Sequence, residues 1–398
     1  MGDFGIAEFA ILAVILSRLL VPLLIIRWPL PAIVASLIID AVDQTVFQAV
    51  APGADLEGYQ SYDKALDIYY LVIAYISTLR NWTSPFAVSI ARFLILYRLV
   101  GVVLFELGVP LPDALADLLG ERGWLFIFPN TFEYFFIFFE SVRLFWDPRR
   151  MSRKLLLGAT AFIWIFIKLP QEWWIHIAQL DTTDLIQEDI FGVPAGTSWS
   201  ETFAAKPWIV VVTVIAVIIA GYVLYWLMKN KLPPRDRPLT IDANAEPGRE
   251  VAPERLSTQR ERMSRHILRR GLLEKVVLLG MVSIIFGQML QLRAEPLELS
   301  LIVAVIIIAN ATLSAMLERY GFGPGAALRQ FVVTGLLNLG ILVALVAVLQ
   351  LSGNPIELVS LYSTGFMLLL ITLLVTLYDR YRPEYLARFA KDPEPAAS

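Results

Sequence analysis

The chain has 398 residues, 57% of them hydrophobic and 17% charged, whereas about 25% of residues are charged in soluble domains. Its net charge of −3 gives no reason to expect a nucleic-acid partner. The absence of cysteine excludes disulfides, thiol catalysis, iron–sulfur clusters and cysteine-based zinc sites. The composition predicts an all-α integral membrane protein.

Apolar stretches of about 20 residues, the length that crosses a bilayer as a helix, recur along the chain. We predict a polytopic helical bundle of about eleven transmembrane helices. In chain order they cover residues 6–27, 30–50, 63–82, 85–107, 124–147, 154–177, 207–229, 272–291, 297–317, 327–350 and 355–379.

Charged residues in the loops orient this bundle. Basic residues gather in alternate loops, for example at Arg149 and Arg150, and acidic residues gather in the others, for example at Asp113 and Asp117. The positive-inside rule then places the N-terminus outside and the C-terminus in the cytoplasm. A composition rich in arginine and free of cysteine suggests a high-GC bacterium, so we expect a multi-pass protein of the plasma membrane.

The intramembrane charge divides the chain into four parts. Residues 1–229 form a seven-helix unit that holds nearly all of the intramembrane charge, and residues 272–379 form a four-helix unit that is poor in charge. The second unit is expected to support the first or to provide a surface for homo-oligomers. Residues 230–271 lie between them, and residues 380–398 are expected to be a cytoplasmic tail.

The connecting part, 230–271, has two sections. Residues 230–253 are rich in proline and charge, so they cannot bury a core and are predicted to be a flexible cytoplasmic linker. Residues 254–271 combine many arginines with apolar residues at helical spacing, which is typical of an amphipathic helix on the anionic inner leaflet. A solvated charged helix explains this section equally well.

Six ionisable residues are predicted to lie near the middle of the membrane, as judged from a rise of about 1.5 Å per residue along each helix. Three are basic and three are acidic, which is the balance that mutual pairing requires, because an unpaired buried charge is neutralised or expelled. They are Arg18, Asp40, Asp43, Arg98, Glu133 and Lys168.

The helix predicted over 154–177 carries the most unusual polar stripe. Lys168, Glu172 and His176 recur at intervals of four residues and therefore share one side of the helix. Pro170 lies among them and removes a backbone hydrogen bond, as is common where membrane helices build a site. We expect this stripe to face Glu133 across a buried polar core.

Each of these charges also has a purely structural explanation. Arg18 and Asp40 can form an ion pair that only joins two helices. Arg92 and Arg98 can orient helices or contact lipid phosphates. His176 is predicted near the outer boundary, where a surface histidine would be ordinary.

Transport is the function that this pattern favours. Intramembrane carboxylates that alternate with lysine and histidine can relay protons or bind a coupling cation, and a polar groove for lipid headgroups is a variant of the same idea. Glu133 and Asp40 would be the protonatable groups, Lys168 their positive partner, and Glu172 with His176 the outer mouth.

Two other classes of function stay open. A membrane enzyme acting on a lipid or lipid-linked phosphate could use the D-x-x-D spacing of Asp40 and Asp43 to hold Mg²⁺, with Arg92 and Arg98 on the phosphates. This motif is short and common. A structural or assembly protein would use the charges only to specify packing. No nucleotide-binding, zinc-protease or paired-histidine motif is present, so we predict no cofactor and no metal site.

Overall fold

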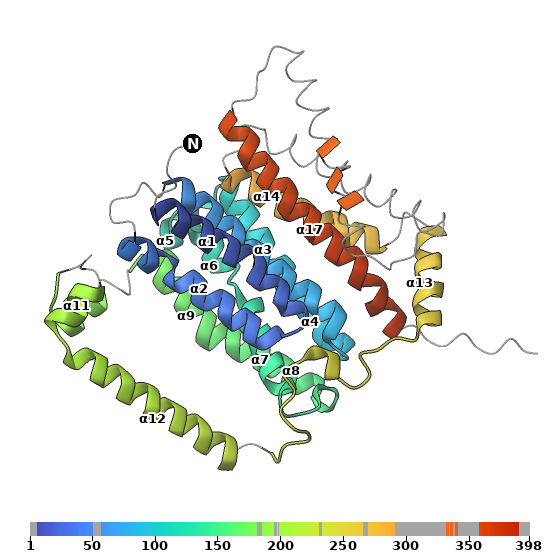
Figure 1. The fold of residues 1–398 in the computed structure, drawn as a ribbon, viewed down its shortest axis with the longest axis horizontal. Helices are drawn as coiled ribbons and strands as arrows, with labels where there is room; N and C mark the ends of the chain where they lie inside the picture. Colours follow the sequence, from blue (N-terminus) through green and yellow to red (C-terminus); the bar gives the residue numbers. More distant parts are fainter. Residues whose placement is uncertain are drawn as a thin grey trace, which may run out of the picture.

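The computed structural model describes residues 6–50, 57–180, 185–194, 197, 199–230, 233–265, 270–290, 332–333, 335–336, 339–340 and 358–389. Within these ranges every regular element is a helix and there is no strand (Figure 1). The all-α prediction is confirmed for this part of the chain. The predicted helix at 297–317 lies outside the described residues, as does His266.

Three kinds of helix make up the fold. The α-helices are α1 (Ile6–Leu20), α2 (Pro29–Val50), α3 (Glu57–Asn81), α4 (Pro85–Glu106), α5 (Asp113–Leu119), α6 (Gly123–Ile127), α7 (Thr131–Arg143), α8 (Arg153–Phe162), α9 (Leu169–Glu172), α11 (Trp199–Ala205), α12 (Trp208–Asn230), α13 (Pro253–Arg265), α14 (Arg270–Met289) and α17 (Leu358–Phe389). The 3-10 turns are η1 (Val21–Ile26), η2 (Pro148–Arg150) and η6 (Ala243–Ala245). The π-helical turns are η3 (Ile163–Lys168), η4 (Trp173–Ile177) and η5 (Ile186–Phe191).

Among the described residues, five helical stretches are long and apolar enough to cross a membrane, and the predicted number of eleven is therefore not confirmed. Two shorter apolar stretches, Ile11–Ile26 and Trp208–Val223, fall below the length of a span. The five long stretches are Pro85–Glu106, Gly123–Arg143, Arg153–Ile177, Leu272–Met289 and Ser363–Phe389.

Helix α3 lies at the centre of the bundle. Helices α1, α2, α4, α14 and α17 all pack against it, and the turn η1 does so as well. The residues from Ala65 to Leu79 are almost all buried, including Tyr69, Tyr75 and the polar Ser77. Helices α14 and α17 therefore pack directly on helices of the first unit.

The predicted helix at 124–147 is broken in the middle. It consists of α6 and α7, and Phe128, Pro129 and Asn130 connect them without helical geometry. Proline has no backbone N–H and disfavours helix in the residue before it, so the sequence FPN accounts for the break. The helix predicted over 154–177 is continuous but contains the π-helical turns η3 and η4 on either side of α9.

The C-terminal helix is longer than predicted. Helix α17 continues to Phe389, whereas we predicted that it would stop at 379 and be followed by a tail. The extension packs against the bundle, since Arg388 donates hydrogen bonds to the carbonyl oxygens of Arg80 (2.6 Å) and Trp82 (3.0 Å) at the end of α3.

Helix α12 stands apart from the bundle in Figure 1, and most of its apolar side chains are exposed.

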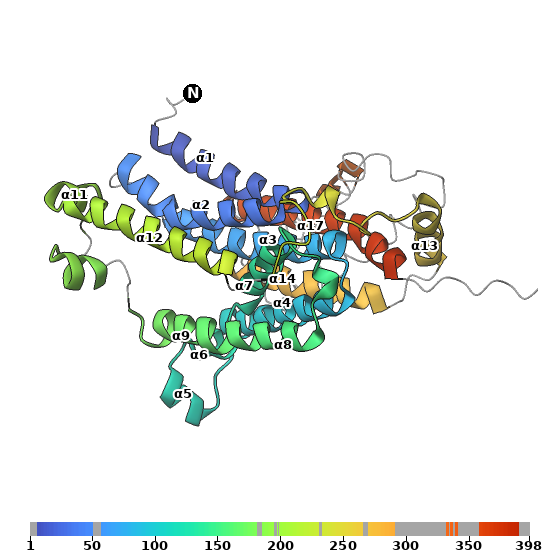
Figure 2. The same ribbon diagram turned by 90° about the horizontal axis from the view of Figure 1, so that it is seen from below.

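Residues 233–252, which we expected to form a flexible linker, lie across the ends of several helices (Figure 2). We call this segment the strap. Glu246 is buried and accepts from Arg143 (3.4 Å) and Arg237 (2.9 Å), and the Ala243 amide donates to the carbonyl of Arg27 (2.8 Å). The strap is held by charge pairs and backbone hydrogen bonds rather than by apolar burial, which explains why its hydrophilic sequence suggested no structure.

The break between α6 and α7 fits closely against Gly101 of α4. A Cβ atom at Gly101 would meet the Phe128 side chain well inside van der Waals contact. We predict that Gly101→Ala destabilises the protein by ~1–3 kcal/mol through overpacking. The measurement is thermal unfolding in detergent. Gly158→Ala is the matched control, since nothing lies within 4 Å of its added methyl group; equal melting temperatures for the two variants would refute the close fit.

The strap should depend on Glu246. We predict that Glu246→Ala leaves Arg237 and Arg143 short of a buried acceptor, destabilises the packed strap by ~1–3 kcal/mol, and speeds proteolytic cleavage within 233–252. Limited proteolysis measures this effect. Glu250 is exposed in the same segment, so the Glu250→Ala variant should be cleaved at the wild-type rate. Equal cleavage rates for the wild type and both variants would show that the Glu246 contacts do not hold the strap.

Candidate functional site

The first polar cluster gathers around Arg18 of α1, and we call it the Arg18 cluster. The guanidinium lies 2.6 Å from Asp40 Oδ1 and 2.7 Å from Asp43 Oδ2 of α2. It also forms ion pairs with Asp63 and Asp67 of α3. Arg18 and Asp43 are each 4% exposed at the side chain, whereas Asp67 is 40% exposed. One buried arginine therefore holds carboxylates from two helices, and the cluster opens to its surroundings at Asp67.

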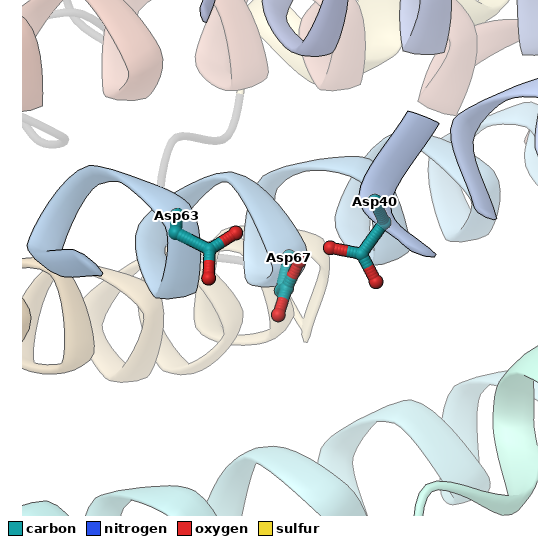
Figure 3. A group of neighbouring side chains, drawn as sticks. All are labelled: Asp40, Asp63 and Asp67. Atoms are coloured by element: carbon teal, nitrogen blue, oxygen red, sulfur yellow. The ribbon is translucent and has the colours of Figure 1, made fainter. Parts of the chain in front are cut away.

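Charge balance is the most informative property of this cluster. Four carboxylates share one guanidinium. Among the described residues, the four carboxylates and Arg18 would together carry three excess negative charges if all four acids were ionised, and such an excess favours the uptake of protons or of a cation. Asp40, Asp63 and Asp67 each offer an oxygen, and these oxygens lie within 4.8 Å of one another (Figure 3). Such an arrangement can share protons or hold a hard cation, which prefers oxygen ligands.

The second cluster is centred on Glu172 of α9, and we call it the Glu172 cluster. Its carboxylate lies 3.0 Å from His176 Nε2, 3.5 Å from Lys168 Nζ and 3.9 Å from an Arg98 nitrogen. It also accepts a hydrogen bond of 3.0 Å from the backbone amide of Asn130. Lys168 and Glu172 are both buried. Three cationic or potentially cationic side chains therefore meet one carboxylate.

Glu133 lies between the two clusters. It accepts hydrogen bonds from Tyr70 Oη (3.0 Å) and from Asn130 Nδ2 (2.7 Å), and it is close enough to Lys168 for their charges to attract. The Lys168 ammonium itself donates to Gln171 Oε1 (2.9 Å) and lies 4.7 Å from the ring centre of Tyr134. The buried Glu133 carboxylate is thus hydrogen-bonded but shares its nearest cation with Glu172.

The break between α6 and α7 positions these groups. Arg98 of α4 donates to the carbonyl oxygens of Leu125 (3.3 Å) and Phe128 (3.0 Å), which the broken helix leaves without helical partners. The same break frees the Asn130 amide for Glu172. The π-helical turns on either side of α9 place Lys168 and His176 on one side, together with Glu172. Discontinuous helices of this kind build many binding sites inside membrane proteins.

Tyr70 of α3 lies between the two clusters. Tyr70 follows Asp67 by three residues on α3, so both project from one side of the helix. The Tyr70 hydroxyl donates to Glu133 Oε2 at 3.0 Å. The Tyr70 hydroxyl, which donates to Glu133, therefore lies between the Glu172 cluster and the side of α3 that carries Asp67.

The structure places the predicted site residues in these two clusters. Arg18, Asp40 and Asp43 belong to the first; Arg98, Lys168, Glu172 and His176 belong to the second; Glu133 lies between. Arg92, which we had grouped with Arg98 as a phosphate contact, lies elsewhere and pairs with Glu274 of α14 (3.0 Å).

Sequence reasoning missed four members of the site. Asp63 and Asp67 lie at the start of the predicted helix 63–82, and their spacing does not predict a contact with Arg18. Tyr70 and Asn130 carry no charge at neutral pH, so the pattern of buried charges does not indicate them. The signals were the spacing of Asp67 and Tyr70 by three residues and the FPN break, which exposes an amide to the site.

Comparison with protein-family models, with curated proteins and with solved structures gave no match in any of the three cases. The functional reading of the site therefore depends on its own chemistry.

Arg18 is predicted to be essential for folding at neutral pH. Arg18→Met leaves the four carboxylates without their shared cation, and removing one partner of a buried ion pair costs about 3–5 kcal/mol. Because protonation removes the repulsion, the variant should regain stability as the pH is lowered, whereas the wild type should not. Thermal unfolding across pH measures this difference. Arg27→Met, whose side chain is 57% exposed, is the control; the same pH profile for both variants would contradict the prediction.

Proposed function

We propose that this chain is an integral membrane transporter in which the Arg18 and Glu172 clusters carry a proton or a coupling cation. The excess of carboxylates around Arg18 is the observation that carries the proposal. A membrane-embedded group of acids that cannot all be ionised at once must exchange protons or cations with its surroundings, and such groups line the pathways of pumps and transporters.

The arrangement of the side chains supports a route with two mouths. Asp67 is the most exposed member of the first cluster, at 40%, and His176 is 15% exposed in the second. Glu133 and Tyr70 lie between them. When Glu133 gains a proton or a cation, Lys168 loses the attraction of that carboxylate and keeps its ion pair with Glu172. This exchange of partners would couple ion binding to the position of the helix that carries Lys168.

An enzyme acting on lipid phosphate is less well supported. Asp43 is buried against Arg18, so the D-x-x-D pair is directed at a guanidinium rather than toward a shared open position. Arg92 pairs with Glu274 of α14, whereas Asp40 and Asp43 pair with Arg18. A structural role for the charges is the remaining alternative, and the flux experiment below separates it from transport.

The setting of the transporter is proposed on sequence grounds. Alternating loop charge supports an outer N-terminus, and the composition supports the plasma membrane of a bacterium. Helix α13 carries Arg255, Arg260, Arg262 and Arg265, which suits contact with anionic lipid at the inner surface.

Flux through proteoliposomes tests the proposed function. With a pH-sensitive dye enclosed and a proton or cation gradient imposed, the wild type should show ion-linked flux, and Glu133→Gln and Lys168→Met should reduce it to background. Asp113→Asn, an exposed carboxylate on α5, should transport like the wild type. Each variant is first checked for folding by gel filtration and thermal melting.

A structural role predicts a different result. The wild type would then show no flux under any gradient, while Glu133→Gln and Lys168→Met would lower the melting temperature. Equal flux in the wild type and in both well-folded variants would also contradict the proposed route, because Glu133 and Lys168 would then not be needed for transport.

A further inference from the structure

A third polar cluster lies where α3, α4, α14 and α17 meet, and neither the site nor the proposed function uses it. Its centre is Glu274 of α14, so we call it the Glu274 cluster. Glu274 accepts from Tyr75 (2.6 Å) and pairs with Arg92 (3.0 Å) and with Arg382 (2.7 Å). Two guanidiniums from different helices therefore share one carboxylate.

This cluster has more donors than acceptors. The Arg92 Nη2, the Arg382 Nε and Nη1, and the Tyr378 hydroxyl are buried and have no hydrogen-bond partner among the described residues. Arg382 is 7% exposed and Tyr378 is 2% exposed, and Tyr378 interacts with the charges of Glu274, Arg382 and Arg92. Buried donors without acceptors are expensive, and unpaired charged donors are the most expensive. The cluster is thus one acidic group short, the reverse of the Arg18 cluster.

The position of the cluster indicates where the missing acid would come from. Glu274 is four residues from the start of α14, and Arg92 is seven from the start of α4. Arg382 is seven residues from the end of α17. At about 1.5 Å per residue these distances are roughly 6–10 Å from the helix ends. In the predicted orientation these are the inner ends, at the level where lipid phosphates meet the hydrocarbon.

Access is from the side of Arg92. Its side chain is 28% exposed, the most of the ion-paired members. The ring of Tyr385 lies over both guanidiniums, with its centre 5.9 Å from Arg92 Cζ and 5.1 Å from Arg382 Cζ. A ligand that approaches Arg92 would displace this ring and reach the unpaired nitrogens behind it.

We propose that the Glu274 cluster binds a phosphate-bearing anion, either a lipid headgroup or free phosphate. A phosphate offers several acceptor oxygens in a compact tetrahedron, and arginine forks bind it in pairs of hydrogen bonds. Arg92 and Arg382 supply the charge and Tyr378 supplies a neutral donor. Glu274 holds the two guanidiniums in place, because removing it would leave them repelling each other.

The test uses the purified full-length protein in neutral detergent. Thermal melting is recorded with short-chain phosphatidylglycerol, with diacylglycerol lacking phosphate, with sodium phosphate, and with sodium chloride at the same ionic strength. The variants are Arg382→Gln and Tyr378→Phe, and Arg150→Gln is the matched control because its side chain is 73% exposed at an interhelix loop.

We expect phosphatidylglycerol or phosphate, but not diacylglycerol or chloride, to raise the melting temperature of the wild type and of Arg150→Gln. Arg382→Gln and Tyr378→Phe should need about tenfold more ligand for the same shift, as expected for the loss of one hydrogen bond to a charged group. A response to lipid alone identifies a headgroup, and a response to phosphate identifies a free anion.

The proposal is overturned if the wild type responds to neither probe, or if Tyr378→Phe and Arg382→Gln respond as the wild type does. Tyr378→Phe nearly preserves the volume of the side chain and should fold. If Arg382→Gln does not fold, the ligand response of Tyr378→Phe alone tests the proposal. The ion-flux experiment is independent of this outcome, since none of its variants touches the Glu274 cluster.

Discussion

A charge that is buried away from water must be paired, protonated or neutralised by a bound ion, and this constraint organises the whole molecule. Among the described residues, four carboxylates pair with Arg18. Around Glu274 the guanidiniums outnumber the carboxylate by two to one. Helix α3 contributes to both, with Asp63 and Asp67 in one cluster and Tyr75 in the other. The first imbalance favours protons or cations, and the second favours an anion.

Backbone breaks give these side chains their partners. The FPN sequence between α6 and α7 frees an amide that reaches Glu172 and carbonyls that reach Arg98. Without the break, Glu172 would lose the Asn130 amide, a donor that does not titrate, and its charge would be stabilised only by Lys168, His176 and Arg98. The close fit of Phe128 on Gly101 holds the break in position. The geometry of the Glu172 cluster is therefore a property of the backbone as much as of the charged residues.

The sequence predicts some levels of this structure much better than others. Long apolar runs predict helices reliably, because a helix satisfies its own backbone in an apolar setting, and the alternation of lysine, glutamate and histidine on α9 and its flanking turns could be read from spacing alone. The contact between Asp67 and Arg18 could not be predicted from spacing, because a position along one helix reveals neither the tilt of that helix nor its neighbours. The strap could not either, since buried Glu246 depends on Arg143, 103 residues away, and no local pattern reports such a pair.

The central claim is that the Arg18 cluster takes up protons or cations. Infrared difference spectroscopy of the protein in lipid, recorded as pH or cation concentration changes, observes carboxyl groups directly. The account predicts carboxyl bands that change in the wild type and disappear when Asp40, Asp63 and Asp67 are all replaced by asparagine. Identical difference spectra for the wild type and this triple variant would show that the cluster is a fixed structural ion pair and would contradict the account.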